Sequence, residues 1–330
     1  MLSPDVSQAR PQCRNFHLHR LALSPQDQTE EILQGLQAPQ KRLPPKLFYD
    51  TRGSRLFDTI TRLPEYYLTR TECELLHNHL PQLQALIGTT GTLLEPGSGS
   101  SDKARLLLDG KHLAAYVPIE ISTEYFIDTA LELAQSYPGL QIHALCGDFM
   151  QLSALPDNLP PPPRTVFFPG STIGNFEPAL AVQLLRRFRS WAGPGGGLLI
   201  GVDTRKDTGV LHRAYNDREG VTAAFNLNML SHVNRLTGAN FQLERFTHKA
   251  FYNGQVGRIE MHLQSLCAQS VRVAGHTIQF RAGETIHTEN SYKYEPARFT
   301  ALAQSAGFRP LHCWLDSRGY FSLHYFVTDQ

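Results

Sequence analysis

The chain has 330 residues, of which 41% are hydrophobic and 18% charged, so it can bury one large core or two ordinary ones and has no composition typical of disorder. Its 31 basic and 30 acidic residues give a net charge of +1, without the basic block that a nucleic-acid partner would favour. No apolar run approaches the roughly 18 residues of a membrane span, and the N-terminus lacks the apolar core of a secretory signal, so we expect no membrane partner and a cytoplasmic location.

The first seventy residues contain no pattern that would give them a partner in a parallel sheet. Residues 1–20 are predicted to be a flexible N-terminus, and residues 21–70 to pack with a second domain. His17 and His19 form an HxH pair, and another lies at 77–79, but neither is joined by cysteine or acidic residues at ligand spacing. The five cysteines are scattered, which favours reduced thiols. The sequence therefore predicts no metal site.

From about residue 92, short apolar runs alternate with helical patterns. This alternation indicates βαβ units and a mostly parallel sheet with helices on both faces. The predicted helices include 123–135 and 178–191. The predicted strands are "TLLEPG", "AAYVPIEI", "LQIHALCGD", "TVFFPGS" and "GGGLLIGVD".

After Asp203 the pattern changes to two helices broken near Gly220, then to antiparallel strands in "RIEMHLQSL", "SVRVAGHTIQF" and "ETIHTENSYKY". A helix in "PARFTALAQSAG" and a hairpin that turns at 316–319 close the chain. We predict an α/β, doubly wound domain interrupted by a mixed α+β domain of about ninety residues. The predicted boundaries are 71–204 and 294–330 for the first domain, and 21–70 and 205–293 for the second.

A glycine turn after the first strand predicts a cofactor site, because ligands of open α/β sheets bind at the carboxyl ends of the strands. Gly97 and Gly99 let a ligand approach the backbone closely. Glu120 ends the second strand and is placed to bind ribose hydroxyls. Asp148 ends the third and can accept from an adenine amino group, with Phe149 beside it to stack on the ring.

The turn lacks the third glycine of a dinucleotide fingerprint, and Asp102 puts negative charge where a pyrophosphate would bind. A cofactor with adenosine but no phosphate fits better, and S-adenosylmethionine has this chemistry. A terminal antiparallel hairpin also suits a methyltransferase sheet. The alternative is a glycine turn without a cofactor, since a lone GxG and an acidic strand end are both common.

Several longer stretches resemble the histidine-specific Nα-methyltransferases of ergothioneine biosynthesis, which trimethylate histidine to hercynine with S-adenosylmethionine. The resemblance runs from about Leu43 to the C-terminus. It implies a Rossmann-like class I methyltransferase sheet with an inserted substrate domain, and L-histidine as substrate. Separately, we expect the protein to be a monomer. The matching stretches are "LPPKLFYDTRGSRLFDTITRLPEYYLTRTE", "EPGSGSSDK", "GDF", "PGSTIGNF", "GVDTRKD", "RAYNDREGVTAAFN" and "RIEMHL".

The resemblance also implies residue roles. Glu120 replaces a more usual aspartate, and Pro96 is a second departure from the family pattern. The implied cofactor contacts are Gly97, Lys103, Glu120, Asp148 and Phe149, with Ser171 near the methionine part. The implied substrate contacts are Tyr49, Phe57, Tyr66, Asn175, Tyr215, Thr222, Met261, Glu289 and Ser291.

The side chains at these positions have suitable chemistry, and each has an ordinary alternative. The Asn175 amide can accept from an α-ammonium and donate to a carboxylate, but an asparagine before "FEPALAV" also suits a turn or a helix cap. The Tyr215 hydroxyl can donate to the substrate carboxylate, although a lone tyrosine is commonly a surface residue.

Glu289 and Ser291 are the residues expected to distinguish histidine from other amino acids. Residues two apart in an extended segment face the same side, so this carboxylate and hydroxyl can bind the two nitrogens of an imidazole, while Asn290 points away. Leaving a buried polar group unpaired costs about 1–3 kcal/mol, which penalises other rings. The alternative is an exposed strand face.

Met261 alternates with Ile259 and Leu263 as in an ordinary core, and the resemblance places it against the substrate ring as well. The aromatic residues Tyr49, Phe57 and Tyr66 suit an amine that becomes a cation, unless they are plain core residues as Phe48 is expected to be. We expect Tyr49 to relay the amine proton and Asn175 to steer the amine.

Two other functions remain open on the sequence. A methyltransferase for another amino acid, of the tryptophan or tyrosine type, would use the same scaffold, although an indole needs a single acceptor and so does not need both Glu289 and Ser291. A non-catalytic binding protein would keep the fold. The retained residues Gly97, Glu120, Asp148 and Asn175 argue against it.

Overall fold

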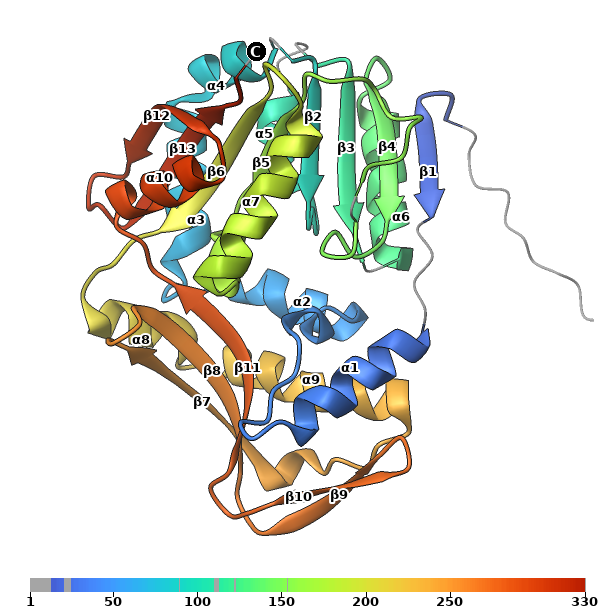
Figure 1. The fold of residues 1–330 in the computed structure, drawn as a ribbon, viewed down its shortest axis with the longest axis vertical. Coiled ribbons are helices and arrows are strands. Elements are labelled where there is room, and N and C mark those ends of the chain that lie inside the picture. Colours follow the sequence, from blue (N-terminus) through green and yellow to red (C-terminus); the bar gives the residue numbers. More distant parts are fainter. Residues whose placement is uncertain are drawn as a thin grey trace, which may run out of the picture.

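The computed structural model describes residues 13–20, 25–88, 90–109, 113–121, 123–152 and 154–329. Figure 1 shows a larger lobe in which helices flank one sheet, and a smaller lobe that contains the strands β7, β8 and β11 and the long helix α9. Within the described residues, none of the helices has the length and hydropathy that crossing a membrane requires.

The large sheet has eight strands over the described residues, in the order β1-β4-β3-β2-β5-β6-β13-β12. All neighbours from β1 to β6 pair in parallel, whereas β13 runs antiparallel to β6 and to β12, so the predicted doubly wound sheet with a returning hairpin is confirmed. The bounds, after β1, are β2 Thr92–Pro96, β3 Ala115–Glu120, β4 Gln141–Cys146, β5 Thr165–Phe168, β6 Gly197–Asp203, β12 Arg309–Leu315 and β13 Phe321–Val327.

The edge strand β1, Phe16–Arg20, contradicts two sequence predictions. It pairs in parallel with β4 (Figure 1), so residues 16–20 are not a flexible segment, and the first seventy residues do have a partner in the parallel sheet. The strand is mostly exposed and has no buried apolar face to signal it. The buried Asn15 fixes its entry by donating to the carbonyls of Ala134 and Leu140. Residues 1–12 lie outside the described residues.

Apolar cores cover both faces of the large sheet. Consecutive strand residues, such as Leu93 and Leu94 or Phe167 and Phe168, pack into different core clusters, because neighbouring side chains of a strand point to opposite faces. The inner parallel strands are therefore mostly apolar and buried, as parallel strands covered on both faces are. The helices of this lobe are α3 Tyr67–Asn78, α4 Leu80–Gly88, α5 Asp102–Leu108, α6 Thr123–Ser136, α7 Pro178–Ala192 and α10 Pro296–Ser305.

The smaller lobe contains a three-stranded antiparallel sheet in the order β11-β8-β7. The predicted helix break is confirmed at Gly220, whose φ of 72° is left-handed. Strand β7 was not predicted, and the segment predicted as one strand forms the hairpin β9-β10. The elements are α8 Thr208–Tyr215, α9 Val221–Thr237, η3 Leu243–Arg245, β7 Phe246–Asn253, β8 Arg258–Ser265, β9 Gln269–Val273, β10 His276–Phe280 and β11 Thr285–Tyr292.

The N-terminal elements α1 Pro25–Gln37, η1 Pro45–Phe48 and α2 Thr51–Ile60 lie beside α9 in Figure 1. Phe48 is fully buried, and its ring stacks on Phe225 of α9 with 4.5 Å between centroids. The Leu47 carbonyl bonds to Nδ1 of His232 at 2.8 Å. These contacts support the predicted association of residues 21–70 with the inserted segment, while the exact domain boundaries stay a prediction.

Candidate active site

The residues predicted to bind the cofactor gather at one edge of the large sheet. Gly97 follows β2, Glu120 ends β3, and Asp148 follows β4, so all three lie at the carboxyl ends of neighbouring parallel strands. Glu120 accepts hydrogen bonds from the backbone N–H of Gly99 at 3.1 Å and of Ile121 at 2.8 Å. The glycine turn and the carboxylate therefore form one structural unit.

The backbone conformation of Gly97 favours glycine, because its φ of +70° is left-handed. A Cβ at this position would lie 3.5 Å from Phe149, in ordinary van der Waals contact with the ring predicted to stack on a cofactor. Close by, the Ser98 hydroxyl is buried and has no hydrogen-bond partner in the part of the chain that the structure describes. An open backbone cradle beside an unpaired buried hydroxyl fits an adenosine-type ligand.

Lys46 of η1 was not predicted for the cofactor edge. Its ammonium lies 3.2 Å from Oδ2 of Asp148 and 2.7 Å from Oε2 of Glu31. The other oxygen of Asp148 accepts from the N–H of Met150 at 2.8 Å. Because η1 belongs to the N-terminal segment, this ion pair connects that segment to the end of β4.

Lys103 and Ser171 complete the predicted cofactor set. The Lys103 ammonium lies 2.5 Å from the buried carboxylate of Glu72, which also accepts from the N–H of Gly170 at 2.9 Å. Ser171 follows Gly170, and its hydroxyl accepts from the N–H of Asp203 at 2.9 Å. The carboxylate of Glu72, which the sequence analysis did not single out, thus holds Lys103 beside the loop that follows β5.

The predicted aromatic residues come together in one cluster. The ring of Phe57 lies 5.8 Å from that of Tyr49 and 6.3 Å from that of Tyr66, and Tyr66 lies 6.4 Å from Tyr215. Phe225 of α9 also contacts Tyr49 and Phe57, at 5.9 and 5.8 Å. Three separate segments therefore supply one aromatic surface, and Phe225 is a member that sequence reasoning missed.

The environment of Tyr49 limits its chemistry. Burial, and then the charges of Glu289 and Glu120, raise the pKa of its hydroxyl well above the ordinary range. Tyr49 is therefore a neutral phenol at physiological pH, which can pass a proton along hydrogen bonds but does not act as a phenolate base.

Asn175 ends the short helix η2 Thr172–Asn175, which follows β5. The cap position of the next helix, α7, is taken by Glu177, and no side chain caps it. The helix-cap alternative for Asn175 is therefore wrong, and its partly buried amide remains beside the carboxyl end of β5.

Glu289 and Ser291 do face the same side of β11. In the sheet register they pair with Met261 and Ile259 of β8, two residues on one face of that strand, and Met261 is 2% exposed. Asn290 points the other way and donates to Glu177 at 3.2 Å. The alternative of an exposed strand face is wrong for Ser291, which is buried. Glu289 is partly buried, so it does not lie on a fully exposed face either.

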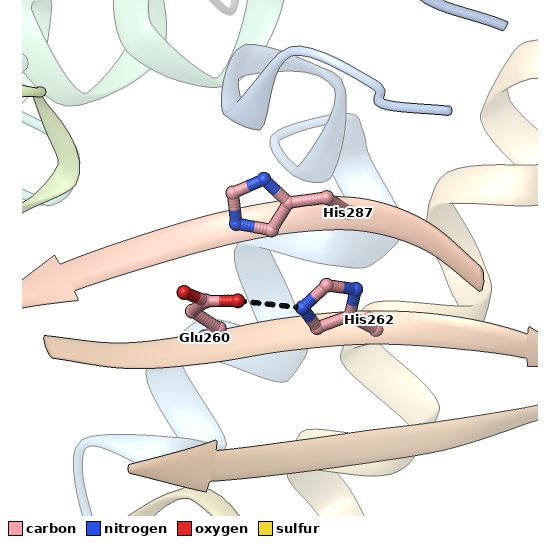
Figure 2. A group of neighbouring side chains, drawn as sticks. All are labelled: Glu260, His262 and His287. Carbon is pink, nitrogen blue, oxygen red and sulfur yellow. Dashed lines mark hydrogen bonds and ion pairs between the residues drawn. The ribbon is translucent and has the colours of Figure 1, made fainter. Parts of the chain in front are cut away.

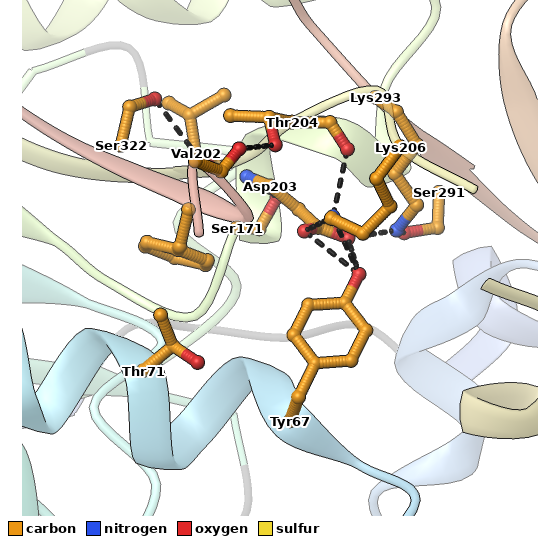
Figure 3. Close-up of polar contacts among 12 residues, drawn as sticks. Tyr67, Thr71, Ser171, Val202, Asp203, Thr204, Lys206, Ser291, Lys293 and Ser322 are labelled. Atoms are coloured by element: carbon orange, nitrogen blue, oxygen red, sulfur yellow. Dashed lines mark hydrogen bonds and ion pairs between the residues drawn. The ribbon is translucent and has the colours of Figure 1, made fainter. Parts of the chain in front are cut away.

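A buried polar network lies next to Ser291 (Figure 3). Tyr215 donates to Oγ of Ser291 at 2.7 Å, so in this arrangement its proton is not directed at the substrate carboxylate, as the sequence analysis expected. Lys293 donates to the same oxygen at 2.7 Å. Lys293 also forms an ion pair with Asp203 at 2.7 Å, and Lys206 contacts the other oxygen of that carboxylate. Lys293 lies two residues after Ser291, just beyond the end of β11. The two-residue period that places Glu289 and Ser291 on one face could therefore have indicated Lys293 as well.

Thr222 is 3% exposed and lies beside the carboxylate of Asp217. Its backbone N–H bonds to Asp217 at 2.8 Å, which holds the first turn of α9. Hydrogen bonds from its hydroxyl and its N–H lower the pKa of Asp217. The substrate contact of Thr222 stays a prediction.

A group with possible metal-ligand atoms lies on the other face of the small sheet. Figure 2 shows Glu260, His262 and His287, whose ligand atoms lie within 4.8 Å of one another. The two imidazoles are stacked, 4.8 Å apart at 27°, so their in-plane lone pairs do not converge. Arg258 also binds the Glu260 carboxylate at 2.8 Å. The geometry favours a hydrogen-bonded stack over a metal centre.

Comparison with known proteins identifies the family. The family model described as histidine-specific methyltransferase, SAM-dependent, matches residues 28–328. The chain belongs to this family. The resemblance drawn from the sequence motifs is thereby confirmed, and S-adenosylmethionine is the family's methyl donor.

Relatives of this histidine-specific methyltransferase include proteins with curated names. The histidine N-alpha-methyltransferase of Mycolicibacterium smegmatis is 44% identical over 89% of this chain and 92% of its own. That of Mycobacterium tuberculosis is 42% identical over the same shares. Ergothioneine biosynthesis protein 1 of Neurospora crassa is 31% identical over 85% of this chain but 32% of its own length.

Proposed function

We propose that this protein transfers methyl groups from S-adenosylmethionine to the α-amino group of L-histidine, three times in succession, to form hercynine for ergothioneine biosynthesis. Glu289 and Ser291, side by side on one face of β11 next to the aromatic cluster, are the observation that carries the proposal. A carboxylate acceptor and a hydroxyl match the two nitrogens of an imidazole.

S-adenosylmethionine supplies an electrophilic methyl carbon on its sulfonium. Gly97, Glu120, Asp148 and Phe149 would hold its adenosine, with Lys103 and Ser171 near its methionine part. The protein's task is then to align a neutral amine with the methyl carbon, since orientation accounts for much of the rate in such displacements. Asn175 would steer the amine, and the neutral phenol of Tyr49 would pass its proton onward.

The aromatic cluster supports repeated methylation. The amine becomes a permanent cation after the third transfer, and the faces of Tyr49, Phe57 and Tyr66 attract such a charge without binding a specific N–H. An amine held this way can rotate between transfers. The monomeric state and the cytoplasmic location stay predictions.

Mass spectrometry tests the function directly. Purified protein is incubated with S-adenosylmethionine and an equimolar mixture of the twenty common amino acids. We expect histidine alone to gain three methyl groups. Methylation of tryptophan or tyrosine instead would retain the scaffold and refute the histidine assignment, and cofactor binding without any methylation would refute the proposed substrate class.

Replacing Gly97 by alanine should weaken S-adenosylmethionine binding roughly tenfold, because a left-handed alanine is strained by about 1–2 kcal/mol and its methyl contacts Phe149. Calorimetry measures the change. Gly195→Ala is the matched control, since Gly195 has the same φ of +70° but has open space around its Cβ position. Equal losses in both variants would mean that strain alone acts.

The pH dependence of histidine turnover should follow Glu289. Burial raises the pKa of Glu289 to about 7, although the charge of Lys293 offsets part of that rise. The ionised form accepts the ring N–H, so kcat/KM for histidine should rise from pH 6 to pH 8. The ratio of wild type to Glu289→Gln cancels the substrate's own titration, and this ratio should retain the step near pH 7. A flat ratio would contradict the assignment.

A further inference from the structure

Lys293 places a buried ammonium directly behind the proposed ring-binding residues. Its side chain is fully buried, and its Nζ donates to Asp203 at 2.7 Å, to Ser291 at 2.7 Å and to Tyr215 at 3.1 Å. Figure 3 shows the ammonium between Asp203 and Ser291. All three N–H bonds of Lys293 are therefore used within the protein.

Lys293 keeps its charge in this environment. Burial by itself favours the neutral amine, but the Asp203 carboxylate and the Tyr215 hydroxyl outweigh burial and raise the pKa of Lys293. Asp203 is ionised as well, because Lys293 and Lys206 outweigh its own burial and lower its pKa. The Lys293 ammonium, which contacts the hydroxyls of Ser291 and Tyr215, is therefore always charged and always a hydrogen-bond donor.

The Lys293 ammonium determines which further hydrogen bonds the hydroxyls of Ser291 and Tyr215 can form. A hydroxyl has one proton and two lone pairs. Ser291 accepts from Lys293 and from Tyr215, so both of its lone pairs are occupied, whereas Tyr215 accepts from Lys293 and donates its only proton to Ser291. The Ser291 proton and one lone pair of Tyr215 remain, so Ser291 itself can only donate to a third group.

The site consequently offers a ring one donor and one acceptor. The remaining hydroxyl proton of the Ser291–Tyr215 pair is the donor, and the Glu289 carboxylate, on the same face of β11, is the acceptor. A neutral imidazole has one bare nitrogen and one N–H, which is the complementary set. An indole or an imidazolium lacks the bare nitrogen.

We propose that Lys293 is a specificity-determining positioning residue: by donating to Ser291 and Tyr215 it makes their remaining proton a donor, so that the site selects a ring with a bare nitrogen beside an N–H. This inference rests on the proposed histidine substrate. Lys293 itself does not touch the ring and acts through the two hydroxyls.

The test compares Lys293→Met with Lys206→Met. Lys206 pairs with the same carboxylate, is nearly as buried, and donates to neither Ser291 nor Tyr215. Binding of L-histidine and of β-(2-thienyl)-L-alanine, whose ring has no nitrogen, is measured by calorimetry with S-adenosylhomocysteine present. The histidine-to-thienylalanine affinity ratio should fall roughly tenfold in Lys293→Met and change less than twofold in Lys206→Met.

A double-mutant cycle separates the proposed role from a structural one. In a Ser291→Ala background, Lys293→Met should change the affinity ratio much less than in the wild-type background, because both substitutions disrupt the same donor. Equal weakening of both ligands by Lys293→Met, or additive effects on the ratio, would overturn the proposal. Failure of wild type to bind histidine would instead refute the proposed function.

A measurement on the wild-type protein covers the case in which Lys293→Met does not fold. Ring-¹⁵N-labelled L-histidine is bound with S-adenosylhomocysteine and observed by NMR at pH 6.5, near the ordinary pKa of a histidine ring, about 6.5. We expect one bare and one protonated nitrogen in the bound ring. Two protonated nitrogens would mean that the hydroxyl pair accepts, and would overturn the proposal.

Discussion

Glu289→Ala should lower kcat/KM for histidine about 100-fold while leaving S-adenosylmethionine binding unchanged. The substitution removes the carboxylate that accepts the ring N–H, and an unpaired buried donor costs about 1–3 kcal/mol, more when the lost partner is charged. The loss should be greatest for histidine, so the preference over an amino acid without a ring N–H should shrink by a similar factor. Steady-state kinetics with both substrates measures it.

Asn290→Ala is the matched control for Glu289→Ala. Asn290 is the next residue of the same strand but points to the opposite face, where it bonds to Glu177. Its removal should change kcat/KM less than twofold. If Glu289→Ala retains histidine turnover within threefold of wild type, Glu289 does not contact the ring, and the assignment of the pocket fails.

Asp203→Asn should lower the free energy of unfolding by about 3–5 kcal/mol, because breaking a buried ion pair from one side leaves an uncompensated charge. Asp203 is fully buried and pairs with both Lys206 and Lys293. Tyr67 also donates to both of its oxygens, at 2.9 and 2.8 Å. The amide would leave two buried ammonium groups without a carboxylate. Urea unfolding at pH 7.5 measures the loss.

Lys206→Met serves as the control for the charge argument. It leaves Asp203 and Lys293 as a one-to-one pair, so no buried charge is uncompensated, and the expected loss is smaller, about 1–2 kcal/mol. Burial lowers the pKa of Lys206 to about 8 despite the attraction of Asp203, so this ammonium is the less firmly held of the two. Equal losses from both substitutions would mean that packing, not charge balance, stabilises the network.

The local pattern of the sequence was sufficient to predict the parallel sheet and the residues at the carboxyl ends of its strands. Apolar runs with a period of two or of 3.6 predict strands and helices, and parallel strands place their carboxyl ends together whatever the loops do. Gly97, Glu120 and Asp148 could therefore be assigned to one edge before the fold was known. The same period placed Glu289 and Ser291 on one face, whereas Lys293, two residues further on, was not singled out.

The hydrophobic pattern of the sequence does not predict the N-terminal strand β1. Strand β1 has no alternating apolar face, since it is an exposed edge, and it is held by backbone pairing with β4, more than a hundred residues later in the chain. A local window contains no information about a partner as distant as β4 is from β1. The local pattern also does not predict β7, and it predicts a single strand where the β9-β10 hairpin forms, although both pair with adjacent segments.

The sequence by itself determined the fold class, the cofactor edge and the face on which the specificity residues lie, because these follow from local periodicity and strand direction. The tertiary structure alone decided the aromatic cluster and the Asp203–Lys293–Tyr215 network, whose members come from distant segments; Tyr215 and Ser291 bond across 76 positions. Periodicity tells which way a side chain points, whereas its partner depends on how separate elements pack. The charge and the hydrogen-bond polarity of the site arise from those partners.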